Sequence, residues 1–364
     1  MITHYSAPGK LFLLGEWAIL EMGNTGVVAA VNKRVHSEVK PADNISITLS
    51  DFNVNDLACV FDGQKLRFAA EEHKDKLKFI KEAIEASLRF INEKGLSPKG
   101  FAIRTWNEEL QINGKKIGFG SSAAATVAVV ASLLAYHDYP AEKEEVYKLA
   151  TIAHYFAQGK VGSAFDVAAS TYGGIFVYRR FDPKWLQEKI DDGIGLPDIV
   201  NEKWPGLYIE QMQEFPDFCL AVGWSGESAS TTDAINKMQS FKESHASEYN
   251  KIMKEISDIA EKFVSAWKKG DSEAAWKCIK QNKLLLRELT GKSGVNIETE
   301  KLKLLAEIAE EYGGAGKLSG AGGGDCGIAV SFDKYVLNGI KEKWEENGIK
   351  VVDADIDKEG VRRD

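Results

Sequence analysis

Apolar residues in the first part of the chain follow two spacings, which predict a mixture of strands and helices. Alternating and valine-rich stretches predict strands at residues 5–14 and 26–40. Apolar positions three and four residues apart predict a helix over residues 71–93. A strand-like segment at residues 101–107 leads to a glycine-rich turn, and the small apolar residues 126–135 behind that turn predict a helix.

The second part of the chain repeats this mixture after a break. The predicted elements are a helix at 144–158, strands at 175–178, 218–223 and 326–332, and helices within 240–290 and at 298–312. Residues 181–206 mix proline, glycine, charged and aromatic residues, so we expect a crossing between two domains with its own short helix. The length of 364 residues also favours two domains. We therefore expect domains at residues 1–185 and 216–364, joined by residues 186–215.

The sequence GFGSSAAA at residues 118–125 predicts a phosphate-binding turn. Its two glycines allow successive backbone N–H groups to face an anion, and the N-terminus of the following helix adds partial positive charge. Lys116 lies just upstream and supplies a full positive charge. The hydroxyl of Ser121 or Ser122 is also able to reach a Mg²⁺ ion bound to that phosphate. A glycine-rich loop that serves close packing remains the alternative.

Two common nucleotide motifs do not account for this turn. The Gly-Lys-Ser at residues 291–293 has Leu286 where a Walker loop requires its first glycine. Residues 118–123 match the dinucleotide fingerprint, but residues 137–145 read as a turn into another helix. A dinucleotide site requires there a strand that ends in a ribose-binding acid. The turn therefore predicts a phosphate site of another kind.

Two further segments support a phosphate site. The sequence APGKLFLLGE at residues 7–16 places Lys10 and Glu16 at the two ends of an apolar strand. The sequence KLSGAGGGDCG at residues 317–327 is a second glycine-rich loop, in which five of the eight residues 320–327 are glycine. Such a loop carries a large conformational-entropy cost, which favours a binding role over a simple connection.

These three segments, in this order and spacing, resemble the GHMP kinase superfamily, which includes galactokinase, homoserine kinase, mevalonate kinase and phosphomevalonate kinase. The resemblance spans essentially the whole chain and is greatest to the bacterial type of phosphomevalonate kinase. It rests further on the segments GKL (9–11), GEWAI (15–19), KWPGL (203–207), GWSG (223–226) and NIETEKLK (296–303). Trp17 stands where mevalonate kinases usually carry histidine, and NGKK at residues 113–116 stands where they usually place proline.

The resemblance implies an α+β protein with the two-domain GHMP kinase fold. Its N-terminal domain would be like domain 2 of ribosomal protein S5, and its C-terminal domain would be ferredoxin-like. The implied reaction is ATP-dependent phosphorylation of (R)-5-phosphomevalonate to 5-diphosphomevalonate in the mevalonate pathway of isoprenoid synthesis. ATP would be the co-substrate and Mg²⁺ the cofactor. Mevalonate kinase, a decarboxylating relative and a non-catalytic small-molecule sensor remain alternatives.

We expect three groups of site residues. Lys10, Lys116 and Asp166 are expected to be catalytic; Asp166 is the one acid in the small-residue segment 163–170, which we expect to be helical. The residues expected to bind ATP are Gly118, Gly120, Ser121, Ser122 and Ala123, with Ser122 also expected at the Mg²⁺ ion. The residues expected to bind substrate are Lys10, Glu16, Ser163, Ser230, Thr231, Ser319, Gly320, Ala321 and Gly322.

Several of these residues have alternative explanations. Lys10 is also explained as a strand-end lysine whose ammonium reaches water, and Glu16 as a helix N-cap or a salt-bridge partner. Ser230 and Thr231 equally suit a helix N-cap. Asp325 lies in the second glycine loop, and we expect it to brace that loop by accepting N–H bonds rather than to act in catalysis.

Composition narrows the class of protein. The net charge of −8 and the absence of a long basic run argue against a nucleic-acid partner. The longest apolar stretch, residues 123–136, is too short to span a bilayer, and no signal peptide is apparent. We therefore expect a cytoplasmic monomer or homodimer without a membrane partner. Four scattered cysteines fit reduced thiols, and six dispersed histidines argue against a His/Cys metal site and for surface or packing roles.

Overall fold

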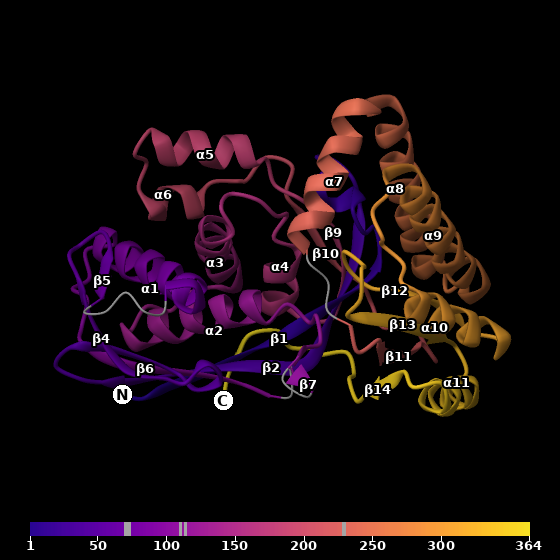
Figure 1. Cartoon of the computed structure of the whole chain (residues 1–364). Helices are drawn as coiled ribbons and strands as arrows, with labels where there is room; N and C mark the ends of the chain where they lie inside the picture. Colours follow the sequence, from indigo (N-terminus) through magenta and orange to yellow (C-terminus); the bar gives the residue numbers. More distant parts are fainter. Residues whose placement is uncertain (69–73, 109–110, 113–114, 228–230) are drawn as a thin grey trace.

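The structure is a computed structural model and describes residues 1–68, 74–108, 111–112, 115–227 and 231–364 (Figure 1). The first strands in these ranges are β1 (Thr3–Leu14), β2 (Gly26–Pro41), β3 (Ile45–Leu49), β4 (Val54–Phe61), β5 (Leu66–Phe68), β6 (Phe101–Asn107), β7 (Gln111–Ile112) and β8 (Lys115–Lys116). They are followed by β9 (Ile175–Arg179), β10 (Tyr208–Gln211), β11 (Cys219–Trp224), β12 (Ala315–Leu318), β13 (Cys326–Ser331), β14 (Lys350–Val352) and β15 (Arg362–Arg363).

The helices in the same ranges are α1 (Lys74–Glu93), α2 (Ser121–Tyr136), α3 (Lys143–Ala157), α4 (Phe165–Tyr172), α5 (Pro183–Asp191), α6 (Leu196–Asn201), α7 (Thr231–Ser244), α8 (Ala246–Lys269), α9 (Ser272–Ser293), α10 (Glu300–Glu311) and α11 (Lys334–Glu346). Two short 3₁₀ helices span Ala18–Leu20 and Ser50–Phe52. Within the described ranges, none of the helices combines the length and the hydrophobicity that a bilayer-spanning segment requires.

The larger sheet contains nine strands of the described part of the chain. Its order is β10-β9-β2-β6-β3-β4-β5, and β1 pairs with β2 in antiparallel orientation. Helices α1 to α4 lie on one side of this sheet (Figure 1). Helix α2 packs against β1 and β2 as well as against α1 and α3, and its alanines and valines suit this position because small side chains permit close approach on every side.

The smaller sheet has the order β12-β13-β11-β14, with antiparallel pairing throughout. The chain passes through β11, helices α7 to α10, β12, β13, α11 and β14, which is the split βαβ arrangement of a ferredoxin-like domain. Helices α10 and α11 cover one face of the sheet, where Leu305, Ile340 and Trp344 are fully buried.

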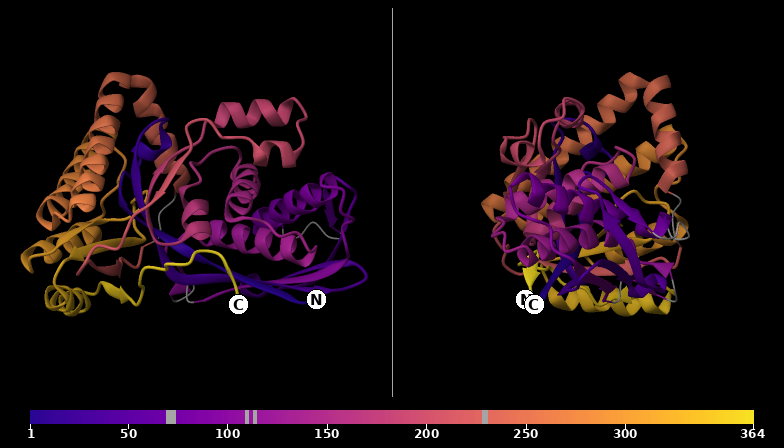
Figure 2. Two further views of the ribbon diagram at one scale, coloured as in Figure 1. Left: turned by 180° about the vertical axis from the view of Figure 1, so that it is seen from behind. Right: turned by 90° about the vertical axis from the view of Figure 1, so that its left-hand side faces the viewer.

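Helices α8 and α9 pair with each other and join the two sheets. Helix α8 also contacts β1 and β2, while α9 contacts β1 and β12. Figure 2 shows α7, α8 and α9 at the end of the molecule opposite to α1. Phe263 of α8, Val28 of β2 and Val222 of β11 belong to the same hydrophobic core, so the two halves of the chain share buried surface.

The α+β class and the ferredoxin-like second half agree with the prediction from sequence. The predicted strand at 101–107 is β6, and the predicted strands at 5–14 and 26–40 differ from β1 and β2 by at most two residues at either end. The proposed crossing, residues 186–215, contains the end of α5, helix α6 and strand β10. Beyond β14, the chain returns to the larger sheet as β15. The domain boundaries at 185 and 215 stay a prediction.

Candidate active site

The first glycine loop forms a turn at the N-terminus of α2. Ile117 and Phe119 are buried and anchor the turn, whereas Gly118 and Gly120 have φ angles of 93° and 76°. These left-handed conformations favour glycine because it lacks a Cβ atom. No described side chain caps the N-terminus of α2, and its first turn contains no acid. The partial positive charge of the helix N-terminus is therefore available to a bound anion.

Strand β1 brings Lys10 against this turn. The backbone N–H of Lys10 donates a hydrogen bond of 2.8 Å to the carbonyl oxygen of Phe119. Its ammonium Nζ donates a second hydrogen bond of 2.8 Å, to the carbonyl oxygen of Gly118. Burial lowers the pKa of Lys10 below its usual range, and the carboxylates of Asp166 and Asp325 oppose part of this effect. Lys10 is thus a desolvated cation held beside the phosphate-binding turn.

Asp166 lies in the first turn of α4 and reaches the same place. A Cβ atom at Gly120 would lie 3.2 Å from Cγ of Lys10 and 3.8 Å from Cβ of Asp166. The Oδ1 atom of Asp166 accepts a hydrogen bond of 3.0 Å from the N–H of Val167. Only 15% of its side-chain surface is exposed. The lysine and the acid therefore flank the glycine turn, and both lie close to its backbone.

Ser163 lies directly before α4 and not inside it. We expected a helix over residues 163–170, but the helix begins at Phe165 because Ala164 takes a left-handed conformation with φ of 59°. The carbonyl oxygen of Ser163 accepts a hydrogen bond from the hydroxyl of Tyr178, which holds the segment in place. The Oγ atom of Ser163 is buried and has no hydrogen-bond partner among the described residues. A buried hydroxyl without a partner is costly, which suggests that a ligand completes its bonding.

The structure places His154 in the site, although the sequence predicts only a surface or packing role for it. His154 lies on α3, and its Nε2 atom is 3.2 Å from Oγ of Ser122 and 4.0 Å from Oδ2 of Asp166. The ring of Phe79 stacks on the imidazole at 5.0 Å. Burial lowers the pKa of His154 and so favours the neutral imidazole, although the nearby Asp166 carboxylate opposes part of this effect. No local pattern indicates this role, because Ser122 and Asp166 lie 32 and 12 residues away from His154 in the chain.

The second glycine loop contributes to the site from the other half of the chain; of its residues 317–327, residues 319–325 connect β12 to β13. The hydroxyl of Ser319 accepts from the N–H of Phe12 at 2.8 Å and donates to the carbonyl oxygen of the same residue at 3.1 Å. These two bonds fasten the loop to β1. Gly320 follows, and a Cβ atom there would lie 3.9 Å from Nζ of Lys10. The two glycine loops therefore approach the same ammonium group.

Asp325 connects the two glycine loops. Its side chain packs on Gly118, where an added Cβ atom would lie 2.8 Å from the Cβ atom of Asp325. Its backbone N–H donates a hydrogen bond of 2.9 Å to the carbonyl oxygen of Glu227. Its own carbonyl oxygen accepts a hydrogen bond of 2.9 Å from the N–H of Ser225. The backbone of Asp325 thus braces the loop, while the expected bracing by its carboxylate stays a prediction; the residue also lines the cavity described next.

These elements surround a cavity of about 350 Å³ between the two halves of the chain. Polar and charged residues line it, among them Lys10, Ser121, Ser122, Asp166 and Asp325. The lining also includes the apolar residues Phe12, Trp17, Ile19, Leu20, Phe165 and Ile235. Both glycine loops contribute to it as well, through Gly118, Gly120 and residues 320–322. A ligand that combines phosphate groups with an apolar part suits this lining.

The structure brings together most of the predicted site residues, but not all of them. Glu16 is fully buried outside the cavity, where its carboxylate pairs with the ammonium of Lys317 and accepts 2.9 Å from Asn282. Glu16 therefore acts as a salt-bridge partner, as the alternative explanation predicts, and the expected direct contact with substrate is wrong. Ala123 is buried in the first turn of α2 and donates its N–H to Gly120 at 3.1 Å.

Three predicted site residues lie wholly or partly outside the residues that the structure describes. Ser230 lies outside the described residues. The backbones of Lys116 and Thr231 are described, in β8 and α7 respectively, but their side chains lie outside the described part. Their expected roles stay predictions.

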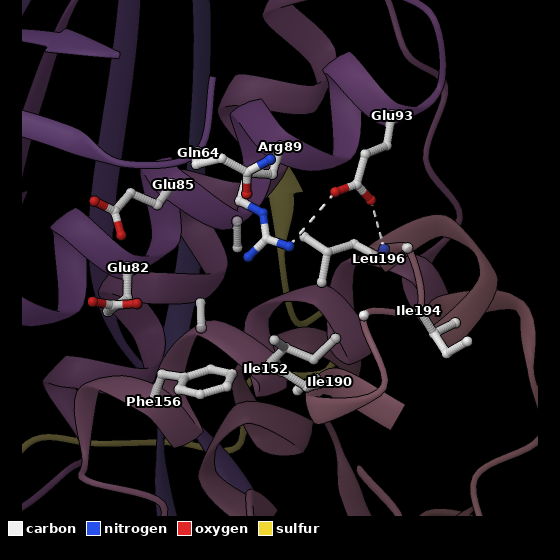
Figure 3. A pocket seen from close by; sticks show the side chains of 14 residues that line it. Gln64, Glu82, Glu85, Arg89, Glu93, Ile152, Phe156, Ile190, Ile194 and Leu196 are labelled. Atoms are coloured by element: carbon white, nitrogen blue, oxygen red, sulfur yellow. Dashed lines mark hydrogen bonds and ion pairs between the residues drawn. The ribbon is translucent and has the colours of Figure 1, made fainter. Parts of the chain in front are cut away.

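A second hollow, of about 280 Å³, lies between α1, α3 and residues 190–196 (Figure 3). Figure 3 shows Glu93 joined both to Arg89 and to the backbone of Leu196. Glu85 accepts a hydrogen bond of 2.6 Å from the N–H of Leu66. Among the described residues that line this hollow, Arg89 is the one cation, and it already contacts an acid. We therefore place phosphate chemistry in the first cavity.

Comparison with known proteins identifies relatives across the whole chain. The family model for the GHMP kinases N terminal domain matches residues 78–174, and the model for the GHMP kinases C terminal domain matches residues 263–350. The phosphomevalonate kinase of Streptomyces sp. (strain CL190) is 30% identical over 361 residues, which cover 94% of each chain.

Solved structures give the same fold. The crystal structure of the Lin0012 protein from Listeria innocua has a TM-score of 0.92 and 33% identity, covering 100% of this chain and 99% of that one. Streptococcus pneumoniae phosphomevalonate kinase, in complex with phosphomevalonate and AMPPNP, has a TM-score of 0.84 and 24% identity, covering 98% and 99% of the two chains. The sequence-based expectation of a two-domain GHMP kinase fold is confirmed.

Proposed function

The chain belongs to the GHMP kinases, and from this premise we propose that it is a phosphomevalonate kinase that uses ATP as co-substrate. The acceptor would be (R)-5-phosphomevalonate and the product 5-diphosphomevalonate. An oxygen of the acceptor phosphate forms a bond to the γ-phosphorus of ATP. The bond from that phosphorus to the β–γ bridging oxygen breaks, and ADP leaves with the electron pair. This reaction would be one step of the mevalonate pathway of isoprenoid synthesis.

The observation that carries the proposal is the convergence of both glycine loops on the ammonium of Lys10. One loop carries the carbonyl oxygen of Gly118 at 2.8 Å from Nζ, and the other places Gly320 next to the same group. Phosphoryl transfer requires that two polyanions approach each other, so a cation and backbone N–H groups are the appropriate charges at the point of contact. The turn at the N-terminus of α2 would hold the nucleotide phosphates, and the cavity beyond Lys10 would hold the acceptor.

The ionisation of the acceptor shapes the role proposed for Asp166. A phosphate monoester has a second pKa of about 6, so its attacking oxygen is mostly ionised at neutral pH. A general base is therefore less necessary than in a kinase that phosphorylates an alcohol. We propose that Asp166 orients Lys10 and the reacting groups, because it lies at the same glycine turn and contributes to the charge environment of Lys10.

The cavity also fits a Mg²⁺ ion by the chemistry of its donors. Carboxylate oxygens of Asp166 and Asp325 and the hydroxyl of Ser122 line it, and Mg²⁺ prefers oxygen ligands together with phosphate. Asp166 and Ser122 would hold the ion, and the 3.2 Å contact with Nε2 of His154 would orient the hydroxyl of Ser122. When bound, Mg²⁺ neutralises charge on the β- and γ-phosphates.

Ser163 is the residue best suited to a contact with the acceptor. Its buried hydroxyl has no partner among the described residues, and it lines the cavity beyond Asp166. A hydroxyl group or carboxylate of the acceptor would complete its bonding. Residues 320–322 of the second glycine loop line the same cavity, and their backbone N–H groups would be further donors to the acceptor.

The proposal is tested by ADP release from ATP in the presence of each acceptor in turn. Mevalonate, 5-phosphomevalonate and 5-diphosphomevalonate are supplied at equal concentration, with CO₂ measured in parallel. Turnover that depends on 5-phosphomevalonate supports the proposal. Preferred turnover of mevalonate would identify a mevalonate kinase, and CO₂ release would identify a decarboxylase. ADP release that none of the three compounds stimulates would support a different acceptor. The absence of ADP release under every condition would support a sensor.

A further inference from the structure

Three side chains from three strands converge on the larger sheet, away from the cavity. His4 lies on β1, His36 lies on β2, and Asp364 directly follows β15. Their ligand atoms all lie within 4.8 Å of one another. None of the three lines the phosphate cavity. The histidines are dispersed along the sequence, which argued against a metal site. In the fold, however, strand pairing brings His4 close to His36, because Ser6, two residues after His4, pairs with His36.

The three atoms form a nearly equilateral triangle. Nε2 of His4 is 3.0 Å from Nδ1 of His36 and 3.7 Å from Oδ2 of Asp364, and the remaining edge, from His36 to Asp364, is 3.3 Å. Zinc ligands lie about 2.0–2.1 Å from the metal, so two ligands of a tetrahedral zinc are about 3.3 Å apart. The three edges observed here span that value, and an ion at zinc distance from all three atoms fits just above their plane.

The surroundings of His36 match those of a metal-binding histidine. Its second ring nitrogen, Nε2, lies 2.9 Å from Oε1 of Glu108. The two groups lack hydrogen-bond geometry, so Glu108 contributes here as a nearby negative charge that favours a cation on the ring. Trp106 stacks on the same ring at 5.0 Å with an interplanar angle of 6°, and it also contacts His4. The side chain of His36 is only 9% exposed, so its orientation is fixed before any ion binds.

We propose that His4, His36 and Asp364 bind a divalent transition-metal cation, with zinc as the preferred ion. Two imidazole nitrogens and one carboxylate oxygen are donors that suit zinc, whereas Mg²⁺ prefers oxygen donors. Water would fill the fourth position, because 30% of the His4 side chain is exposed. The ion would fasten the end of the chain to β1 and β2. This inference does not depend on the proposed function.

The segment that carries Asp364 is anchored without an ion. Arg34 forms a buried ion pair with Asp357, and the N–H of Asp364 donates 3.0 Å to the carbonyl oxygen of His4. Strand β15 also pairs with β1 at Tyr5 and Ser6. Substitution of Asp364 should therefore leave the fold intact, which makes Asp364→Asn a suitable test variant.

The test is a zinc titration of the chain of residues 1–364, freed of metal with a chelator and kept in excess Mg²⁺. Calorimetry measures stoichiometry and affinity, and the thermal unfolding midpoint gives a second readout. The variants are His4→Gln, Asp364→Asn and Glu108→Gln, with His245→Gln as the matched control, because His245 is exposed and lies outside the cluster. Competing thiols are not a concern in the folded chain, since all four cysteines are buried.

We expect the wild type and His245→Gln to bind one equivalent of zinc with equal affinity and to gain thermal stability. His4→Gln and Asp364→Asn should each bind at least tenfold more weakly, and Glu108→Gln should show a smaller loss, because it removes only a nearby, half-exposed charge. Cobalt bound by the wild type should give the visible absorption of a tetrahedral complex. Zinc binding that is absent from the wild type would overturn the proposal. Binding that is equal in all variants would also overturn it, because the zinc would then occupy another site.

Discussion

The ammonium group of Lys10 donates a 2.8 Å hydrogen bond to the carbonyl oxygen of Gly118, a residue 108 positions later in the chain. The bond ties that carbonyl to the lysine, next to the turn that leads into α2. A phosphate held by the N–H groups of this turn would therefore lie beside a fixed cation. The cation costs desolvation energy in the absence of ligand, and a bound phosphate would offset this cost.

This environment predicts an alkaline limit to activity. Burial lowers the pKa of Lys10, and deprotonation removes the charge that attracts phosphate. We therefore expect kcat/KM, which reports groups of the free enzyme, to fall as the pH rises, with a midpoint below the usual 10.5 of lysine. In Lys10→Arg the guanidinium stays protonated, so the fall should disappear or move to higher pH, even though activity at neutral pH is reduced. An unchanged midpoint in Lys10→Arg would assign the titration to another group.

A second prediction concerns Gly120 and nucleotide affinity. Gly120→Val should abolish detectable ATP binding, because the side chain would press on Lys10, 3.2 Å from an added Cβ atom, and would fill the phosphate site. Gly270→Val is the matched control: its φ of 69° resembles the 76° of Gly120, yet nothing lies within 4 Å of its added Cβ atom. Calorimetry should show binding in the control only. Unchanged binding in a folded Gly120→Val would move the phosphate site away from this turn.

The role of Asp166 is open to a pH measurement. If the acid orients Lys10 and the reacting groups, Asp166→Asn should lose much activity but keep a rise in kcat/KM near pH 6 with 5-phosphomevalonate. That rise would come from the acceptor's own phosphate, whose second pKa is about 6. If Asp166 is instead the general base, the rise should vanish with the carboxylate. The comparison of both profiles decides between the two roles.

His154 should act as a positioning residue through Ser122. His154→Phe keeps the ring that stacks on Phe79 but removes the nitrogen that lies 3.2 Å from the hydroxyl of Ser122, so we expect kcat to fall about tenfold, the cost of roughly one hydrogen bond. His154→Gln restores a polar nitrogen and should recover part of the loss. A merely structural histidine would give the opposite order, with Phe tolerated better than Gln in the buried position. The thermal midpoint of each variant checks that the fold is retained.

Much of the site was predictable because its residues occur in short, ordered motifs. Gly118, Gly120 and Lys10 lie in segments whose glycines and charge already indicate phosphate, and the structure places them together. Periodicity was equally informative for β6 and α10, where apolar positions follow one spacing from end to end. The predicted segments and the observed elements there differ by no more than two residues at each end.

What the sequence could not predict depends on contacts between distant residues. Glu16 reads as a pocket residue until the fold brings Lys317 to it, 301 positions away. His154 and the pair of His4 and His36 look dispersed, and only strand pairing and helix packing give them partners. Strand β4 was missed because its alternation is obscured: Leu57, Cys59 and Phe61 face the core, but the apolar Val60 between them is exposed. Such features follow from topology, which local spacing does not record.

The most direct test of the account is the transfer of the γ-phosphoryl group of ATP to 5-phosphomevalonate by the wild type, by Lys10→Ala and by Lys40→Ala. Lys40 is the control, because its side chain is 51% exposed on β2 and pairs with Glu38. We expect the wild type to prefer 5-phosphomevalonate to mevalonate, and we expect Lys40→Ala to have the same kcat/KM as the wild type. Lys10→Ala should lose at least about a hundredfold in kcat/KM, equivalent to about 2.7 kcal/mol. Preference for mevalonate, or wild-type transfer by Lys10→Ala, would contradict it.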